Sequence, residues 1–270
     1  MLKFLKKFYI FIIFTFLYAP IAVLIVYSFN SRKSSKWGGF TFDWYIQLFQ
    51  DKRIMNSWGV TLRVAIFSAI IATVIGTMAA IGISNMKKRT KAAVLSVNNI
   101  PVTNPDIITG VSLMLLFIAL GFERGELTLL LAHITFNIPY VILSVLPKLR
   151  QTNNLTYEAA LDLGATPFSA FWKVVFHEIK PGIFTGFLLA FTLSFDDFMI
   201  SNYTGGTAQT LAVTIFSMTK KKINPKIYAL SSIMFLTVLI LLVIVNLRQS
   251  KDNKNNPKKE RKLKKVEKNL

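Results

Sequence analysis

The sequence predicts an all-α membrane protein with six transmembrane helices, and three observations support that fold class. Of the 270 residues, 53% are hydrophobic and the mean hydropathy is +0.48, which is too apolar for an ordinary soluble domain. Several apolar runs approach about 20 residues, the length that a helix needs to cross a bilayer. Most Lys and Arg residues lie in the connections between these runs, as the positive-inside rule expects of a membrane protein.

Charge and cysteine usage exclude other classes of protein. The formal net charge of +19 could suggest a nucleic-acid partner, but the positive residues separate apolar segments, so they indicate a lipid membrane and no nucleic acid. The absence of Cys excludes disulfides and thiolate metal sites. We therefore expect a multi-pass protein of the plasma membrane, with both termini in the cytoplasm.

Six apolar segments are the expected spans, and they cover residues 8–29, 60–83, 92–120, 127–146, 183–203 and 227–247. The first follows Lys3, Lys6 and Lys7 and resembles a secretory signal. It is too long for a signal's apolar region and no small-residue cleavage site follows it, so we interpret it as an uncleaved span. Residues 1–247 then form one transmembrane domain, and 248–270 form a basic cytoplasmic tail without apolar periodicity, expected to be disordered.

The connections alternate between the two sides of the membrane. Residues 30–56 are expected outside, with the aromatic-rich stretch 37–49 along the outer interface, where Trp and Tyr are favoured. Residues 204–226 are also expected outside. Residues 155–181 are expected in the cytoplasm, between the fourth and fifth spans.

The third and fourth spans carry polar residues at membrane depth. The third is interrupted by polar and helix-breaking residues, namely Asn98, Asn99, Pro101, Asn104, Pro105 and Asp106. A broken helix is tolerated there only where it faces protein or a water-filled path. The fourth contains His133, for which hydrogen bonding between helices is a simpler role than catalysis.

Residues 155–181, which we name the docking segment, are not apolar enough to span a bilayer. Gly164 can end a first short helix in the left-handed conformation, and Thr166 with Pro167 are typical of the start of a second. The second helix presents one apolar face, formed by Phe168, Phe171, Trp172, Val175 and Phe176. Two short helices at a membrane surface indicate a docking device for a partner, although an ordinary amphipathic loop has the same pattern.

Three acidic residues are the candidates for a substrate path. A charge at the bilayer centre costs roughly 2.5–3.5 kcal/mol on insertion scales, so an acid retained there usually has a function. Asp106 follows the broken part of the third span, and Asp196 and Asp197 lie together in the fifth. The functional interpretation is that they line a route for a cationic substrate. The alternative is that they cap broken helices or lie at the outer interface, where they accept hydrogen bonds from backbone amides.

Enzymatic chemistry is not expected of this chain. It contains no GxxxxGK[ST] phosphate loop, so it is not expected to hold ATP. Its two His residues form no metal-binding pattern, and no nucleophile–base pair follows from the residue spacing. If ATP drives the protein, hydrolysis occurs on another subunit.

The docking segment resembles the EAA loop of ABC-importer permeases. Glu158, Ala159, Ala160 and Gly164 match that pattern in identity and spacing, whereas Val174, Phe176 and His177 depart from its Ile-x-Leu-Pro end. The resemblance implies a type I ABC-importer permease fold with cytoplasmic EAA coupling helices. It also implies that Glu158, Ala159, Ala160 and Gly164 couple the chain to an ATPase.

Further stretches resemble the second permease of spermidine/putrescine ABC importers, from about residue 8 to about residue 247. They read FLYAPIAVLIVYSFN, GFTFDWYIQLF, NPDIITGVSLMLLF, HITFNIPYVI and LLAFTLSFDDFMIS. The resemblance implies a homologous permease partner, an ATPase dimer that holds ATP and Mg, and an extracytoplasmic polyamine-binding protein. It implies no cofactor in this chain, and it places Asp106, Asp196 and Asp197 on a polyamine path.

Other functions share part of this pattern. A secondary transporter or channel also has broken helices and buried acids, and a scaffold protein also recruits a partner through a cytoplasmic loop. Dependence on an ATPase partner separates the first from an ABC permease, and substrate flux separates the second. An ABC permease for another substrate, such as iron or thiamine, remains an alternative, whereas anions fit poorly with paired membrane carboxylates.

Overall fold

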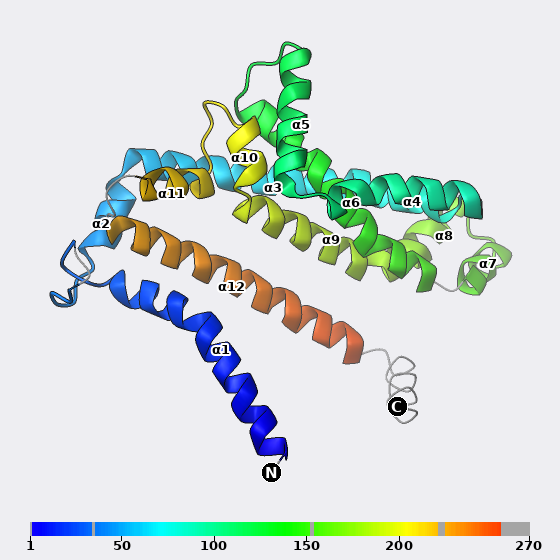
Figure 1. Cartoon of the computed structure of the whole chain (residues 1–270). Coiled ribbons are helices and arrows are strands. Elements are labelled where there is room, and N and C mark those ends of the chain that lie inside the picture. Colours follow the sequence, from blue (N-terminus) through cyan, green and yellow to red (C-terminus); the bar gives the residue numbers. More distant parts are fainter. Residues whose placement is uncertain (1, 34–35, 152–153, 221–224, 255–270) are drawn as a thin grey trace. The chain divides into compact units, whose positions relative to one another are not determined.

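The computed structural model describes residues 2–33, 36–151, 154–220 and 225–254, and the secondary-structure elements in this part of the chain are helices (Figure 1). Their bounds are α1 Leu2–Tyr27, α2 Asp43–Gln50, α3 Lys52–Ser84, α4 Lys88–Thr103, α5 Asp106–Ala119, α6 Glu126–Gln151, α7 Asn154–Asp162, α8 Pro167–Ala170, the π-helix η1 Phe171–Val175, α9 Phe176–Asp196, α10 Met199–Thr204, α11 Leu211–Thr219 and α12 Pro225–Lys254. Asn30 and Phe40 form an isolated antiparallel β-bridge. The predicted all-α class is therefore confirmed.

The chain divides into two compact units. The first comprises Met1–Gly59 and Leu211–Ile240, and the second comprises Val60–Thr210 and Leu241–Leu270. Within the first unit, the loop after α1 is held to α2 because the Trp44 indole N–H donates to the Asn30 carbonyl over 2.7 Å. The beginning of α3 is held to α11 by the hydroxyls of Ser57 and Thr214, which lie 2.7 Å apart.

The core of the second unit lies among α3, α6 and α9. Its buried members are Ala69, Ala72, Ala80, Ile83, Val141, Ile142, Val145, Leu146, Ile179 and Ala190. Small residues let the helix backbones approach closely, as is common between membrane helices. At Gly76 a Cβ atom would lie only 2.7 Å from Cβ of Val141, so a larger residue would push α3 away from α6.

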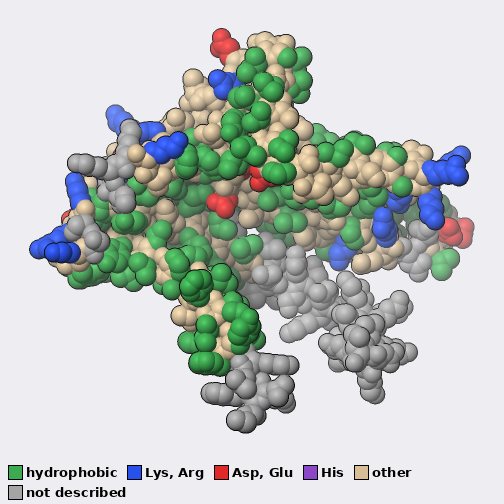
Figure 2. All heavy atoms as spheres, viewed as in Figure 1, with side chains coloured by type: hydrophobic (Ala, Val, Ile, Leu, Met, Phe, Trp, Pro, Cys, Tyr) green, Lys and Arg blue, Asp and Glu red, His purple; other side chains and the backbone are tan. Residues whose placement is uncertain are grey.

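The apolar helices agree in part with the six predicted spans. Four described helical segments are long and apolar enough to cross a membrane, namely Lys7–Tyr27, Lys52–Ser84, Glu126–Gln151 and Pro167–Asp196. Pro225–Ile240 is a shorter apolar helix. Hydrophobic side chains cover much of the surface in Figure 2, and Lys and Arg side chains gather at the end of α4 that begins at Lys88. The total of six spans stays a prediction.

The third predicted span, 92–120, is not one straight helix. α4 and α5 form a pair bent by 104° at the break after Thr103. Pro105 lacks a backbone N–H and disfavours a helical conformation at Asn104, whose backbone is extended (φ −80°, ψ 146°). The predicted interruption is confirmed, and its consequence is a change of direction that places Asp106 at the start of a new helix.

The fifth predicted span, 183–203, has the wrong bounds. The helix begins at Pro167, runs without a gap through η1 and α9, and ends at Asp196, so the second docking helix and the span form one helical segment. Pro181 lies inside α9, where membrane helices tolerate proline. After Asp196 the backbone becomes extended at Asp197, and α10 is a separate short helix.

Helices also occur in segments predicted as loops or tail. Residues 30–56 contain α2, and residues 204–226 contain α11. α12 continues past Leu247 to Lys254, so the first residues of the predicted tail are helical. The remainder of the predicted tail, 255–270, lies outside the described residues.

Candidate functional site

The first helix of the docking segment, α7, ends at Asp162, and Gly164 follows as the stop residue that the sequence predicts. The Ala165 N–H donates to the Ala160 carbonyl over 3.0 Å, and the Gly164 N–H donates to the Leu161 carbonyl over 2.9 Å. This pair of bonds is a Schellman motif, which needs a left-handed residue at the position of Gly164. Its φ is +85°, a value that glycine adopts without a Cβ penalty. The motif turns the chain sharply between α7 and α8.

The second helix begins at the predicted cap. Oγ1 of Thr166 accepts a hydrogen bond from the Ser169 N–H over 3.3 Å, and Pro167 occupies the first helical position. The helix then widens into η1, where the Phe176 N–H donates to the Phe171 carbonyl, five residues earlier. Such π-helical turns often occur at functional sites. Here the turn lies where the docking helix passes into α9.

The apolar face predicted for the second helix is divided by the structure. Phe168 is 75% exposed and Trp172 is 47% exposed, whereas Phe171 and Val175 line a cavity inside the unit. Leu163, in the turn before Gly164, is 89% exposed. Three large apolar side chains therefore remain uncovered at the turn and in the second docking helix, and we name Leu163, Phe168 and Trp172 the docking patch.

The predicted coupling residues lie on α7 and in its C-terminal turn. Glu158 and Ala159 are exposed and Ala160 is partly buried. Because Ala160 also accepts the hydrogen bond that closes the Schellman motif, its backbone and Gly164 act together in one turn. The structure thus brings Glu158, Ala159, Ala160 and Gly164 close to one another, and their role in coupling stays a prediction.

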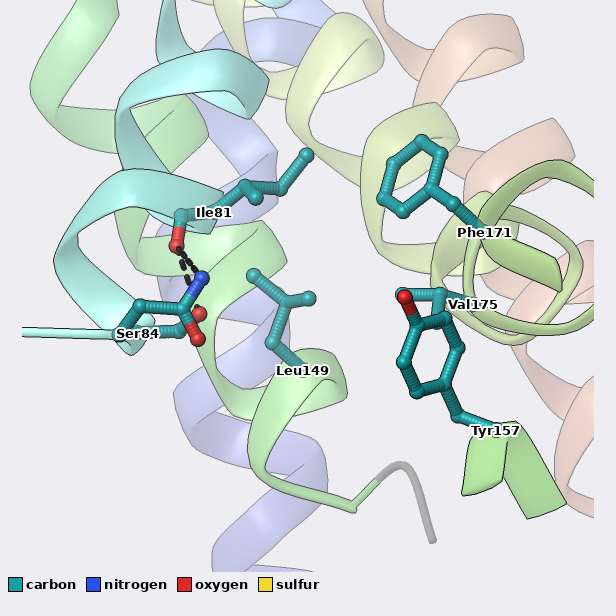
Figure 3. A pocket seen from close by; sticks show the side chains of 7 residues that line it. Ile81, Ser84, Leu149, Tyr157, Phe171 and Val175 are labelled. Atoms are coloured by element: carbon teal, nitrogen blue, oxygen red, sulfur yellow. Dashed lines mark hydrogen bonds between the residues drawn. The ribbon is translucent and has the colours of Figure 1, made fainter. Parts of the chain in front are cut away.

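A cavity of about 290 Å³ separates the docking segment from the ends of α3 and α6 (Figure 3). Its lining residues are Ile81, Ser84, Asn85, Leu149, Tyr157, Phe171 and Val175. In Figure 3 the side chains of Tyr157, Phe171 and Val175 lie opposite those of Ile81 and Leu149. This cavity leaves room for the docking segment to shift against α3 and α6.

A second cavity brings the three predicted acids together. It has a volume of about 370 Å³ and is lined by Asp106, Phe136, Thr192, Leu193, Asp196, Asp197, Phe198 and Met199. We name it the acid cavity. The acids come from the first residue of α5, the last residue of α9 and the connection to α10. Breaks in two predicted spans therefore meet at one place.

The three acids have different surroundings. Asp106 and Asp196 are exposed, whereas the side chain of Asp197 is only 6% exposed. Oδ1 of Asp197 accepts a hydrogen bond from the Ile200 N–H over 3.2 Å, and Oδ2 accepts one from the Ser201 N–H over 2.7 Å. These bonds cap the beginning of α10. Asp197 thus has the capping geometry that we considered as the alternative to a path residue, although it also lines the cavity.

His133 forms the expected contact between helices. Its imidazole is fully buried, and Nε2 lies 3.1 Å from Oγ of Ser201 and 3.6 Å from Oδ2 of Asp197. Sequence reasoning missed Ser201 as its partner and Phe136 as a residue that lines the acid cavity. A signal for Phe136 was present, because residues three apart on a helix lie on the same face.

A buried polar cluster joins α3, α6 and α9 near the acid cavity. Nδ2 of Asn137 donates to Oγ of Ser194 over 2.7 Å and to Oγ of Ser68 over 3.4 Å. The two serine oxygens are 3.0 Å apart. Hydrogen bonds of this kind hold membrane helices together. In the described part of the chain, no group of three His, Cys, Asp or Glu residues is arranged to hold a metal ion.

Comparison with known proteins identifies related sequences. Residues 72–250 match the family described as binding-protein-dependent transport system inner membrane component. The chain is 40% identical over 229 residues to the putrescine transport system permease protein PotI of Escherichia coli (strain K12), covering 82% of each protein. It is 35% identical over 246 residues to the spermidine/putrescine transport system permease protein PotC of Haemophilus influenzae, covering 90% of this chain and 96% of that protein.

Solved structures share the fold. A bacterial ABC transporter involved in the import of the acidic polysaccharide alginate superposes with a TM-score of 0.70 over 91% of this chain and 95% of that chain, at 14% identity. An amino acid ABC transporter superposes with a TM-score of 0.60 over 78% of this chain and 100% of that chain, at 17% identity. At identities this low, the superpositions show a common fold only. That common fold confirms the predicted fold of type I ABC-importer permeases.

Proposed function

Because the chain belongs to the family of binding-protein-dependent transport system inner membrane components, we propose that it is the permease subunit of an ABC importer for polyamines. The observation that carries the proposal is its similarity to putrescine and spermidine/putrescine permeases over more than four fifths of its length. The substrates are putrescine, spermidine or both. The chain is a multi-pass protein of the plasma membrane, and in this proposal both of its termini face the cytoplasm.

The acid cavity supports a cationic substrate. Polyamines carry several ammonium groups joined by methylene chains. Asp106, Asp196 and Asp197 line one cavity, and the exposed carboxylates of Asp106 and Asp196 supply negative charge there. Phe136 and Phe198 line the same space, where aromatic rings contact methylene groups and attract ammonium groups. Several weak carboxylate contacts suit passage better than one tight site. An anionic substrate would meet repulsion from the same carboxylates, although an importer of an acidic polysaccharide shares the fold.

The docking segment supports a separate source of energy. In this proposal a pair of ATPase subunits holds ATP and Mg, and the chain itself performs no catalysis. The docking patch is the contact with the ATPase, because Leu163, Phe168 and Trp172 are large apolar side chains left uncovered at the turn between α7 and α8. Glu158, Ala159, Ala160 and Gly164 shape the same contact. A homologous second permease and an extracytoplasmic polyamine-binding protein complete the importer.

The mechanism that follows is alternating access. Closure of the ATPase pair on ATP pushes on the docking patch, and the helical segment Pro167–Asp196 carries that displacement from the docking helix to Asp196. The displacement reorients the acid cavity between the binding protein and the cytoplasm. One continuous helix makes this connection direct, since no flexible loop separates the docking contact from the carboxylate.

The test is transport by the complete importer in proteoliposomes. Radiolabelled putrescine and spermidine are supplied with the binding protein on one side and ATP on the ATPase side. The proposal predicts uptake that requires both ATP and the binding protein. An assembled complex that hydrolyses ATP but accumulates neither polyamine would contradict it and would favour an ABC permease for another substrate. Uptake without ATP would favour a secondary transporter.

A further inference from the structure

α10 is a short helix held from two sides in the second unit. On one side, Asp197 caps its beginning and Ser201 contacts His133 of α6. On the other side it packs against α5, and Figure 1 shows the two helices beside each other. A Cβ atom at Gly110 of α5 would lie 3.3 Å from Cα of Ile200 and 3.3 Å from the Met199 carbonyl oxygen. The two backbones therefore touch at this glycine.

The contact between α5 and α10 is part of a buried apolar cluster. Ile200 packs with Phe117 of α5 and with Ala132 and Phe136 of α6. Because Asp106 is the first residue of α5, the position of α10 sets where Asp106 lies. Asp196 ends α9 immediately before the cap residue, so its position also depends on the geometry of that cap.

The three acids differ in how their carboxylates are used. Both oxygens of Asp197 accept hydrogen bonds from α10 amides, and the side chain is only 6% exposed, so this carboxylate is less accessible to an ammonium ion than the other two. The carboxylates of Asp106 and Asp196 form no hydrogen bond or ion pair with another side chain or backbone group in the described part of the chain. Their oxygens are available to a cation entering the acid cavity.

We propose that His133 and Asp197 are positioning residues, which fix α10 against α5 and α6 and thereby hold Asp106 and Asp196 where both can contact a polyamine. This inference rests on the proposed polyamine function and assigns separate roles within its site. The imidazole acts through Nε2, which reaches both Ser201 and Asp197, whereas Nδ1 is buried and forms no hydrogen bond. The side chain of Asp197 is required as a hydrogen-bond acceptor, and its negative charge is not required to bind substrate.

Isosteric substitutions separate the two roles of the acids. Asn caps helices about as well as Asp. Its single amide oxygen can keep one of the two bonds that cap α10, so Asp197→Asn removes the charge and one acceptor but retains a cap. Asp106→Asn and Asp196→Asn remove a charge that contacts substrate. In the complete importer we expect Asp197→Asn to keep polyamine uptake per ATP hydrolysed within about twofold of wild type. We expect each of the other two variants to reduce it by about tenfold, the scale of one charge-assisted hydrogen bond.

A matched pair at His133 tests the positioning role. The side-chain nitrogen of Gln can occupy the place of Nε2, whereas that of Asn reaches only the place of Nδ1. We therefore expect His133→Gln to retain uptake per ATP and His133→Asn to lower it several-fold, with ATPase activity and complex assembly unchanged in both. A role limited to folding would lower assembly and ATPase activity together in the Asn variant.

The outcomes separate this inference from the proposed function. No polyamine uptake by the assembled wild-type importer would overturn the function. Wild-type uptake with Asp197→Asn as impaired as Asp196→Asn would overturn the inference alone, because the charge of Asp197 would then be needed by the substrate. Equal activities of the Gln and Asn variants at His133 would also overturn it.

Discussion

The docking segment and the acid cavity differ in how their residues are brought together. Everything that shapes the turn between α7 and α8 lies within a few residues of Gly164, in the cap at Thr166 and in the Schellman bonds. The acid cavity instead takes residues from α5, α6, α9 and the connection to α10, which are far apart in the sequence. A local contact surface can therefore be recognised from a short motif, whereas the roles of residues in a path depend on packing.

The largest expected effect comes from removing both exposed acids of the cavity. The double variant Asp106→Asn with Asp196→Asn should lower polyamine uptake by more than about tenfold, because two charge-assisted contacts with ammonium groups are lost. ATP hydrolysis should continue, since the docking segment is unchanged. Uptake and ATPase activity are measured in the same vesicles, and unchanged uptake would contradict a path through this cavity.

Placing a charge in the docking patch should lower ATP hydrolysis, which the acid-cavity variant leaves unchanged. Phe168→Glu replaces a phenyl ring that is 75% exposed with a carboxylate, so folding of the chain should be little changed. Contact with the ATPase should weaken, lowering ATP hydrolysis and uptake together by about tenfold, as expected for an interface aromatic. Co-purification of the ATPase checks the loss directly. Lys180→Glu is a matched control outside the patch, and an equal loss there would argue against the patch.

Strain in the turn should have a smaller effect. At φ +85° an added Cβ at Gly164 costs about 1–2 kcal/mol, although no other atom lies within contact distance of it. Gly164→Ala should therefore lower coupled ATPase activity several-fold and leave the acid cavity intact. Gly82→Ala is a useful control, since its Cβ also meets no neighbour and its φ is not positive. Equal effects of the two variants would exclude backbone strain as the cause.

Loss of the helix cap should have the smallest effect. Thr166→Ala removes the acceptor for the Ser169 N–H, which is worth roughly 1 kcal/mol at a helix beginning. The effect should be at most a few-fold on coupling, because η1 and α9 continue to support the helix. Thr166→Ser keeps the acceptor and should restore wild-type activity. A deficit in the Ser variant as large as that in the Ala variant would show that the cap is not responsible.

The sequence was sufficient where hydropathy or local backbone chemistry decides the structure. Apolar length located helices near all six predicted spans, and Gly164, Thr166 and Pro167 marked the turn. It was insufficient where packing decides. The docking segment was predicted to end at Pro181, before a separate span, but α9 passes through this residue. The break after Thr103 was predicted, but its angle of 104° was not.

The acid cavity shows the same limit more sharply. Asp106, Asp196 and Asp197 were recognised as a group because charges are rare at membrane depth. Their unequal surroundings could not be recognised, since the α10 amides and His133 reach Asp197 only in the folded chain. The π-helical turn η1 was also missed, because no local pattern in Phe171–Val175 distinguishes it from an α-helix.

The two regions are compared most directly in one preparation of the importer. Polyamine uptake and ATP hydrolysis are measured together for wild type, for Asp106→Asn with Asp196→Asn, and for Phe168→Glu. We expect the acid variant to hydrolyse ATP without uptake and the patch variant to lose both activities. Loss of both activities in the acid variant, or uptake at the wild-type rate in either variant, would contradict the assignment of transport to the cavity and of coupling to the docking segment.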